Sequence, residues 1–365
     1  MKALTVGGAM IDTIAIIESD RIERMSMQNA ETSFLLLQEG RKTEATEIST
    51  HCGGGAVNAA VSMARLGVDV STLVKLGKDD RAETMLARLM QEGVSTRYAL
   101  RDARLPTGAS VLIASHERNA AVFTFRGANT LLEEDDLRDD AFEVDVVYIT
   151  TLSNNSADCY PLIVEKARAR GALVAANPGV RQLSARGASF KKMLSSVDIL
   201  AINRAEAEVI VTGLVAEYGE GGPALDANDG KPLPKLATRG LHGGGFNMSL
   251  RGFLLALLGS GAKCILLTDG KDGAFVARSG ELYHCPSHIM SDVAGTAGAG
   301  DAFTSTYTVY KAQGHAVEQA LIAATLNAAS VLRYADTQSG LMRRADLETS
   351  IKENAPAIAV QRWAL

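Results

Sequence analysis

Residues 295–303 read GTAGAGDAF, and this stretch gives the strongest indication of the fold and of a site within it. Small residues precede Asp301, and a long helical pattern begins near Ala302. The N–H groups in the first turn of a helix have no partner within the helix, and the helix dipole favours an anion beside them. Asp301 could therefore accept a hydroxyl proton while a transferring phosphoryl group binds the backbone N–H groups of Gly298, Ala299 and Gly300.

A purely structural alternative exists for this stretch. Asp301 could cap the helix N-terminus while the glycines form a tight turn. For an isolated Gly-Asp pair this structural role is the commoner one. Evidence from other parts of the sequence is therefore needed to distinguish a helix cap from a catalytic aspartate.

Short apolar runs typical of buried strands alternate with helical patterns along the chain. Lys2–Val6 is such a run; it stops at Gly7-Gly8, and Asp12 follows just beyond that turn. The later strand and helix patterns cover residues 57–66, 69–76, 144–150, 160–169, 172–176, 197–202 and 263–268. Repeated strand-helix units predict an α/β fold whose mostly parallel central sheet has helices on both faces. Ligands of such sheets bind beyond the carboxyl ends of the strands.

Two stretches break this alternation and predict a small β appendage. One follows Asp12, and the other resembles a hairpin with strands over 109–115 and 120–125. We assign residues 13–50 and 105–126 to the appendage, and residues 1–12, 51–104 and 127–365 to the α/β core. Residues 214–261 are too long for an ordinary loop and are predicted to be a functional insertion within the core or a mobile segment.

The composition is that of a globular protein and excludes several classes of function. The 365 residues are 47% hydrophobic and 22% charged, with a formal net charge of −5 that argues against nucleic acid and membrane surfaces as partners. No signal peptide or transmembrane run is recognised, so we expect a cytoplasmic protein. Neither the four scattered cysteines nor the histidines, among them His51 and His288, show metal-ligand spacing, and we expect these histidines to be surface or core residues.

Two blocks of sequence resemble the signatures of one known family. GTAGAGDAF resembles the second signature of the ribokinase (PfkB carbohydrate kinase) family, D-T-x-G-A-G-D, whose last Asp is the catalytic base. Residues 52–67, CGGGAVNAAVSMARLG, are similar to its first signature of two glycines, an asparagine and a helix ending in A-R-L-G. The resemblance implies a ribokinase-like three-layer α/β/α fold in which the appendage is a lid over the substrate.

The resemblance also implies which residues bind the phosphate acceptor, the sugar or nucleoside whose hydroxyl is phosphorylated. They are Gly53, Gly54, Asn58 and Asp12. The glycines offer bare backbone, Asn58 offers a donor and an acceptor, and the Asp12 carboxylate suits vicinal hydroxyls. The structural alternative is a glycine turn followed by an asparagine that caps a helix.

Further matches, weak when taken alone, lie on the nucleotide side. NRAE resembles the family's N-x-x-E element beside the triphosphate, with Asn203 at the nucleotide and Glu206 at its magnesium ion. TDGKDG resembles a nucleotide loop that would use Thr268, Gly270 and Gly273. A surface helix and a hairpin turn are the respective structural alternatives. The resemblance implies ATP and Mg²⁺ as cofactors.

Several positions depart from the family pattern. Gly295 replaces an Asp that is associated with a monovalent-cation site, which counts against such a cation, although Asp292 lies nearby. Met10 and Gly55 stand where ribokinase carries Asn and Lys, which favours a nucleoside or a modified sugar over bare ribose.

The sequence therefore predicts a kinase that transfers phosphate from ATP to a hydroxyl of a sugar or nucleoside, with a homodimer through the lid as a possible assembly. The alternative is a nucleotide- or sugar-binding sensor with the same fold and no catalysis, because fold does not determine function. A dinucleotide-dependent oxidoreductase fits poorly, since Gly7-Gly8 does not supply the G-x-G-x-x-G fingerprint.

Overall fold

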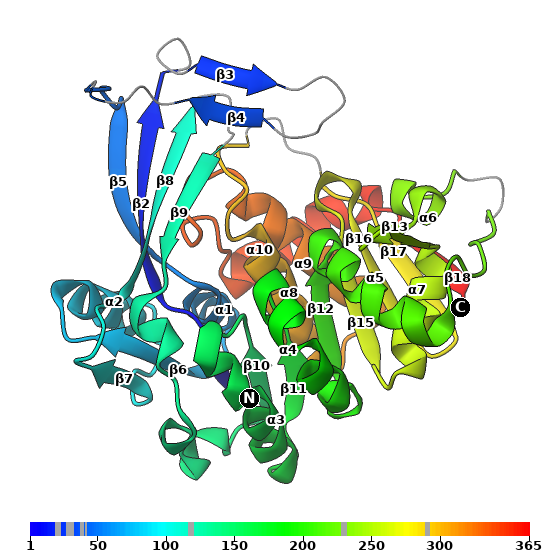
Figure 1. Cartoon of the computed structure of the whole chain (residues 1–365), viewed down its shortest axis with the longest axis horizontal. Coiled ribbons are helices and arrows are strands. Elements are labelled where there is room, and N and C mark those ends of the chain that lie inside the picture. Colours follow the sequence, from blue (N-terminus) through cyan, green and yellow to red (C-terminus); the bar gives the residue numbers. More distant parts are fainter. Residues whose placement is uncertain are drawn as a thin grey trace.

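The computed structural model describes residues 1–18, 23–26, 33–36, 40, 42–115, 120–227, 232–288 and 293–365. The described residues form a large sheet flanked by helices and a small sheet that stands beside it (Figure 1). This confirms the predicted α/β class with a mostly parallel central sheet and a small separate lid sheet. No helix among the described residues combines the length and the apolar character needed to cross a membrane.

The large sheet has ten strands within the described residues. In spatial order they are β18 (Gln361–Ala364), β17 (Glu281–Cys285), β16 (Ala274–Arg278), β15 (Cys264–Thr268), β12 (Ile199–Asn203), β11 (Leu173–Ala176), β10 (Val146–Ile149), β1 (Lys2–Val6), β6 (Asp69–Gly77) and β7 (Ala99–Asp102). The pairs from β15 to β7 are parallel, and those from β15 to β18 are antiparallel. The inner strands, such as β10 and β11, are nearly continuous apolar runs because helices cover both of their faces, whereas the edge strand β7 is only partly buried.

Two hydrophobic clusters place the helices on opposite faces of this sheet. Val147 and Ile149 contribute to one cluster and Val146 and Tyr148 to the other, as expected when side chains alternate along a strand. The first face carries α3 (Tyr160–Ala169), α4 (Val180–Met193), α5 (Arg204–Tyr218), α6 (Lys235–Arg239) and α7 (Leu250–Gly259). The second carries α1 (Gly55–Arg65), α2 (Asp80–Gln91), α8 (Ala299–Ala312), α9 (Val317–Val331) and α10 (Arg344–Asn354).

The small sheet contains the strands β5 (Glu47–Gly53), β2 (Met10–Ile17), β8 (Gly108–Ser115) and β9 (Ala120–Phe125), in that order. The predicted hairpin is confirmed, because β8 and β9 pair antiparallel, while its tip, residues 116–119, lies outside the described residues. A short pair, β3 (Glu23–Ser26) and β4 (Ser33–Leu36), lies at the far end of this sheet (Figure 1). The strands β2 and β5 extend to Met10 and Gly53, slightly beyond the boundaries assigned to the appendage.

The segment predicted to be an insertion contains regular structure in its described part. It begins within α5, continues with α6, the hairpin of β13 (Leu241–Gly243) and β14 (Phe246–Met248), and ends after α7. Leu236, Leu241 and Met248 are buried in the same cluster as α5 and α7. Packing against the core therefore orders this part of the segment.

Candidate active site

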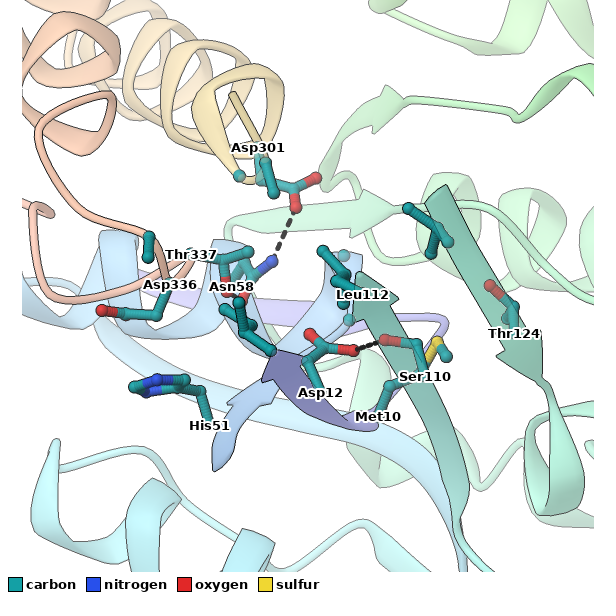
Figure 2. Close-up of a pocket in the computed structure, with 17 residues that line it drawn as sticks. Met10, Asp12, His51, Asn58, Ser110, Leu112, Thr124, Asp301, Asp336 and Thr337 are labelled. Carbon is teal, nitrogen blue, oxygen red and sulfur yellow. Dashed lines mark hydrogen bonds between the residues drawn. The ribbon is translucent and has the colours of Figure 1, made fainter. Parts of the chain in front are cut away.

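A cavity of about 270 Å³, here called the lid cavity, lies between the small sheet and the first turn of α8 (Figure 2). Asp12, Ser110 and Thr124 line it from β2, β8 and β9. Asn58 and Asp301 line it from α1 and α8. Residues far apart in the chain thus meet in one cavity at the carboxyl edge of the large sheet, which is the expected place for a ligand.

Asp301 is held by a network that begins at Asn58. The amide Nδ2 of Asn58 donates to Oδ2 of Asp301 at 2.8 Å (Figure 2). The Asn58 Oδ1 accepts from Thr337 Oγ1 at 2.9 Å and from Gln338 Nε2 at 3.2 Å, so its amide nitrogen must face Asp301. The network fixes the Asp301 carboxylate while leaving its second oxygen for a ligand.

In both structural alternatives the glycine turn is present, but the assignment of Asp301 and Asn58 as helix caps is wrong. Gly298 is the N-cap of α8 and Asp301 is the third helical residue, so Asp301 does not cap the helix. Asn58 likewise lies inside α1, whose N-cap is Gly54. Helix α8 begins at Ala299 rather than near Ala302. Gly298 has φ of +80°, and a Cβ atom there would lie 2.7 Å from Cβ of Thr337, so this turn requires glycine.

The electrostatic environment of Asp301 shifts its pKa above the ordinary value of a carboxyl group. Burial raises the pKa of Asp301, the hydrogen bond from Asn58 lowers it, and the charge of Asp12 raises it further, with a net upward shift. Burial also raises the pKa of Asp12, against the lowering effect of its bond from Ser110. Raised carboxylate pKa values in a cavity are typical of acid–base sites.

Asp12 is positioned by its strand neighbours. It lies opposite Ser110 on β8, whose hydroxyl donates to its carboxylate, and opposite His51 on β5. A Cβ atom on Gly53 would lie 2.0 Å from Oδ2 of Asp12. Gly53 therefore makes room for the Asp12 carboxylate, whereas Gly54 lines the cavity itself.

A second cavity of about 500 Å³, here called the edge cavity, lies on the other side of the first turn of α8. The predicted residues Asn203, Thr268, Gly270 and Gly273 line its polar part. Its apolar part comes mainly from α8 and α9, from Phe303, Ala328, Ala329 and Leu332. An apolar cavity with glycine backbone at its edge is of the kind that can accommodate a nucleotide base and its phosphates.

One helical turn joins the two cavities. Gly298 and Asp301 line the lid cavity, while the next residues, Ala299 and Gly300, line the edge cavity. The first-turn N–H groups of α8 therefore lie between the two cavities.

Glu206 does not line either cavity. Its carboxylate accepts from the N–H of Asn203 at 2.8 Å, and Asn203 Oδ1 accepts from the N–H of Glu206 at 3.0 Å, which is a capping box at the start of α5. Burial raises the pKa of Glu206 to about 7; its bonds with Asn203 lower it and the charge of Asp301 raises it. Glu206 is buried, and its capping box is the structural role that the surface-helix alternative implies.

The raised pKa of Glu206 predicts a specific dependence of stability on pH. The folded protein retains this proton up to about pH 7, whereas the unfolded chain loses it near 4.5, so the free energy of unfolding falls across this interval. Glu206→Gln keeps the capping acceptor and removes the titration. The melting temperature of the variant minus that of the wild type should rise from pH 5 to pH 8; a difference independent of pH would contradict this assignment.

Several residues of the lid cavity were not identified from the sequence. Ser110, Thr124, Thr337 and Asp336 line it, and His51 lies there instead of being an ordinary surface or core residue. His288 similarly lines the edge cavity. The sequence offered one clue to these residues, the alternation of polar residues in the predicted hairpin. This alternation places Ser110 on one face of the hairpin, but it does not reveal that Ser110 lies opposite Asp12.

The loop around Gly295 packs against the segment after α9. A Cβ atom on Gly295 would lie 3.1 Å from the carbonyl oxygen of Tyr334 and 3.4 Å from that of Ala335. The N–H groups of Ala294 and Gly295 donate to the carbonyl of Leu332. Asp292, which we considered as a substitute for the missing carboxylate, lies outside the described residues.

Two cavities that meet at a helix N-terminus beside a buried carboxylate are an arrangement typical of group-transfer enzymes. The model of the pfkB family of carbohydrate kinases matches residues 20–216 and 251–344. The chain belongs to this family. It is thus a sugar or nucleoside kinase, a phosphotransferase with an alcohol group as acceptor. The unmatched residues between 216 and 251 fall within the predicted insertion.

Several individual proteins resemble this chain in sequence or in fold. A deoxyribokinase of Salmonella typhimurium is 24% identical over 329 residues, which cover 89% of this chain and 94% of the relative. A protein of E. coli provisionally assigned as ribokinase II, solved with ATP and Mg²⁺, has a TM-score of 0.70 at 17% identity and covers 96% of this chain and 99% of its own. A nucleoside kinase of Burkholderia thailandensis, solved with inosine, has a TM-score of 0.69 at 16% identity, with coverage of 96% and 98%.

Proposed function

We propose that the protein transfers the γ-phosphoryl group of ATP to a hydroxyl of a sugar or nucleoside bound in the lid cavity. The observation that carries this proposal is the position of the first turn of α8 between the two cavities. A nucleotide in the edge cavity and an acceptor in the lid cavity would both reach this turn. Phosphoryl transfer consists mainly of such positioning and of charge stabilisation.

In this mechanism Asp301 is the general base. Its free carboxylate oxygen accepts the proton of the acceptor hydroxyl while the hydroxyl oxygen forms its bond to the γ-phosphorus. The bond from this phosphorus to the β,γ-bridging oxygen breaks, and ADP leaves with that oxygen. The N–H groups of Gly298, Ala299 and Gly300 stabilise the charge on the transferring group. Asp12, Asn58 and the backbone at Gly54 hold and orient the acceptor.

The edge cavity fits ATP, with Asn203, Thr268, Gly270 and Gly273 as the contacts we propose. Magnesium would neutralise part of the charge of the phosphates. Among the described residues, no group of three or more His, Cys, Asp or Glu side chains could hold a metal ion. Glu206, next to Asn203 of the edge cavity at the start of α5, is the single carboxylate that we propose would help to hold a nucleotide-bound ion. No monovalent cation belongs to this proposal, because Gly295 supplies no carboxylate.

A screen of nucleosides and pentoses separates this kinase from a non-catalytic sensor. Each compound is first tested for thermal stabilisation together with a non-hydrolysable ATP analogue, and each hit is then tested for ADP release with ATP. A kinase releases ADP only when its acceptor is present. A sensor is stabilised by its ligand and releases no ADP, which would overturn the proposal.

The role of Asp12 gives a prediction for the two substrates. Because its carboxylate faces the lid cavity and not the edge cavity, Asp12→Ala should raise the KM of the acceptor at least tenfold. The KM of ATP should change far less. Initial rates measured against each substrate check this, and equal effects on both KM values would remove Asp12 from acceptor binding.

The outer face of the small sheet supports a dimer of two lids. Val111, Phe123, Phe125 and Ile48 are exposed on the face that points away from the lid cavity. A second copy that covered this face would remove these apolar side chains from water. We expect light scattering to give twice the mass of one chain, and Phe123→Asp to give the mass of one chain. A wild-type protein with the mass of a single chain would contradict the dimer.

A further inference from the structure

Helix α6 belongs to a segment that the family model does not match, and the function proposed above gives this helix no role. The model matches the chain up to residue 216 and again from residue 251, and α6 lies between these limits. The helix nevertheless has a fixed position. Leu236 of α6 and Leu241 of β13 are fully buried, and a Cβ atom on Gly243 would lie 1.8 Å from the carbonyl oxygen of Glu208 in α5. Such close packing holds α6 against the core.

The charged side chains of α6 reach the loop TDGKDG, residues 268–273, which borders the edge cavity. Nη2 of Arg239 lies 3.6 Å from Oδ1 of Asp269 in this loop. Arg204, in the first turn of α5, approaches the same oxygen with its Nη1 at 3.5 Å. One carboxylate of the loop is thus held between an arginine of the core and an arginine of the unmatched segment.

A second ion pair joins α6 to the same loop, but it is open to water. Nζ of Lys235 contacts Oδ1 of Asp272 at 2.8 Å, and the lysine side chain is 71% exposed. Exposed ion pairs contribute little to stability. The side chain of Asp269, by contrast, is only 3% exposed. Asp269 is therefore the carboxylate that depends on its partners, because a buried charge that loses a partner is strongly unfavourable.

The two arginines supply the main compensation for the charge of Asp269. Within the part of the chain that the structure describes, Oδ2 of Asp269 is buried and has no hydrogen-bond partner. Burial raises the pKa of Asp269, while the charges of Arg239 and Arg204 lower it, with a net upward shift. Removal of Arg239 would leave less compensating charge beside a buried carboxylate.

The position of Asp269 also determines the position of two glycines that line the edge cavity, Gly270 and Gly273. The N–H of Asp269 donates to the carbonyl of Gly273 at 2.8 Å, and the N–H of Gly273 donates to the carbonyl of Gly270 at 3.2 Å. Gly270 and Gly273 have φ of +55° and +97°, which favours glycine at both positions. A displacement of Asp269 would therefore displace the backbone that lines the cavity.

We propose that Asp269 and Arg239 are positioning residues for ATP, through which α6 sets the affinity of the edge cavity for the nucleotide. They hold the TDGKDG loop in the conformation that receives ATP, and a loop that is ordered in advance loses less entropy on binding. Neither side chain lines the edge cavity, so both act through the loop. This inference rests on the proposed function, because it takes the edge cavity to hold ATP.

The test measures nucleotide binding and turnover in matched variants. The proteins are the wild type, Arg239→Gln, Arg239→Lys, Asp269→Asn and the double variant of Arg239→Gln with Asp269→Asn. The control is Arg186→Gln, because Arg186 is also a paired arginine and contacts Asp158 at 3.1 Å on α4. Calorimetry gives the Kd of MgADP, and initial rates with an acceptor from the screen give the KM of each substrate.

We expect the Kd of MgADP and the KM of ATP to rise by about fivefold or more in Arg239→Gln and in Asp269→Asn. Arg239→Lys, which keeps the charge, should bind MgADP more tightly than Arg239→Gln. The value of kcat and the KM of the acceptor should stay within about twofold, because the loop binds ATP equally in the ground state and the transition state. In the double variant the KM of ATP should rise less than the product of the two single effects, because no buried charge is left without its partner.

Unchanged affinity for MgADP in both single variants would overturn the inference while leaving the kinase intact. An equal rise in the KM of ATP and of the acceptor would also overturn it, because this is the result of a general loss of structure. A loss of affinity in Arg186→Gln as large as in Arg239→Gln would count against it in the same way.

The Kd of MgADP decides if no acceptor is phosphorylated. A weaker affinity in Arg239→Gln that is absent in Arg186→Gln would support the role of α6 even though the proposed function had failed. If a single variant does not fold, the double variant is compared with Arg186→Gln, and an unchanged Kd in the double variant would overturn the inference. A wild-type protein that does not bind MgADP would refute it together with the nucleotide site.

Discussion

Replacement of Asp301 by asparagine is expected to lower kcat by about 10²- to 10⁴-fold, the usual range for loss of a general base. Asparagine has nearly the same shape and keeps an oxygen that can accept from Asn58, so the network around the site should persist. It cannot accept the hydroxyl proton at neutral pH. Binding of ATP should change little, because Asp301 lines the lid cavity and not the edge cavity.

Steady-state rates and calorimetric titration with an ATP analogue measure these two effects separately. Asp346→Asn is a matched control, because Asp346 is also the third residue of its helix, α10, and is exposed. Retained turnover in Asp301→Asn would exclude Asp301 as the base. An equal loss in both variants would indicate a general effect of the change in charge.

Removal of magnesium should have an effect of at least comparable size. A chelator that keeps free Mg²⁺ negligible is expected to reduce turnover by about 10³-fold or more, because a metal ion contributes several kcal/mol of charge stabilisation. The described residues provide no cluster of metal ligands, so the ion should arrive with the nucleotide. Added Mg²⁺ should fully restore activity.

Calorimetry of Mg²⁺ binding checks directly whether the ion arrives with the nucleotide. Without nucleotide, we expect no tight binding of Mg²⁺ to the protein. Turnover that persists in the chelator would contradict the requirement for magnesium, and tight binding of Mg²⁺ to the protein alone would contradict an ion that arrives with the nucleotide.

The elements of the core could be predicted because their signals are local. The strand expected over Lys2–Val6 and the helix expected over residues 160–169 coincide with β1 and α3. A strand covered on both faces is a short apolar run, and a helix that covers it repeats its apolar residues with helical spacing. The start of α8 was missed because small residues carry little helical pattern and Gly298 provides the cap with its backbone alone.

The arrangement of the site could be predicted only in part. Asp301 and Asn58 were each identified from their motifs, but their hydrogen bond joins residues 243 positions apart and no spacing reveals it. The contact between Ser110 and Asp12 depends on the parallel pairing of β2 with β8, which is likewise non-local. Thr337 is brought to Asn58 by a loop that Arg65 anchors through the carbonyl of Gln338.

The most direct test of the central claim is a count of products in a single reaction. The protein is incubated with ATP, Mg²⁺ and an acceptor from the screen, and both ADP and the phosphorylated acceptor are quantified by mass spectrometry. We predict that the two products form in equal amounts, and that neither forms in Asp301→Asn at a comparable rate. ADP without phosphorylated acceptor, or an acceptor that binds and is recovered unchanged, would contradict the account.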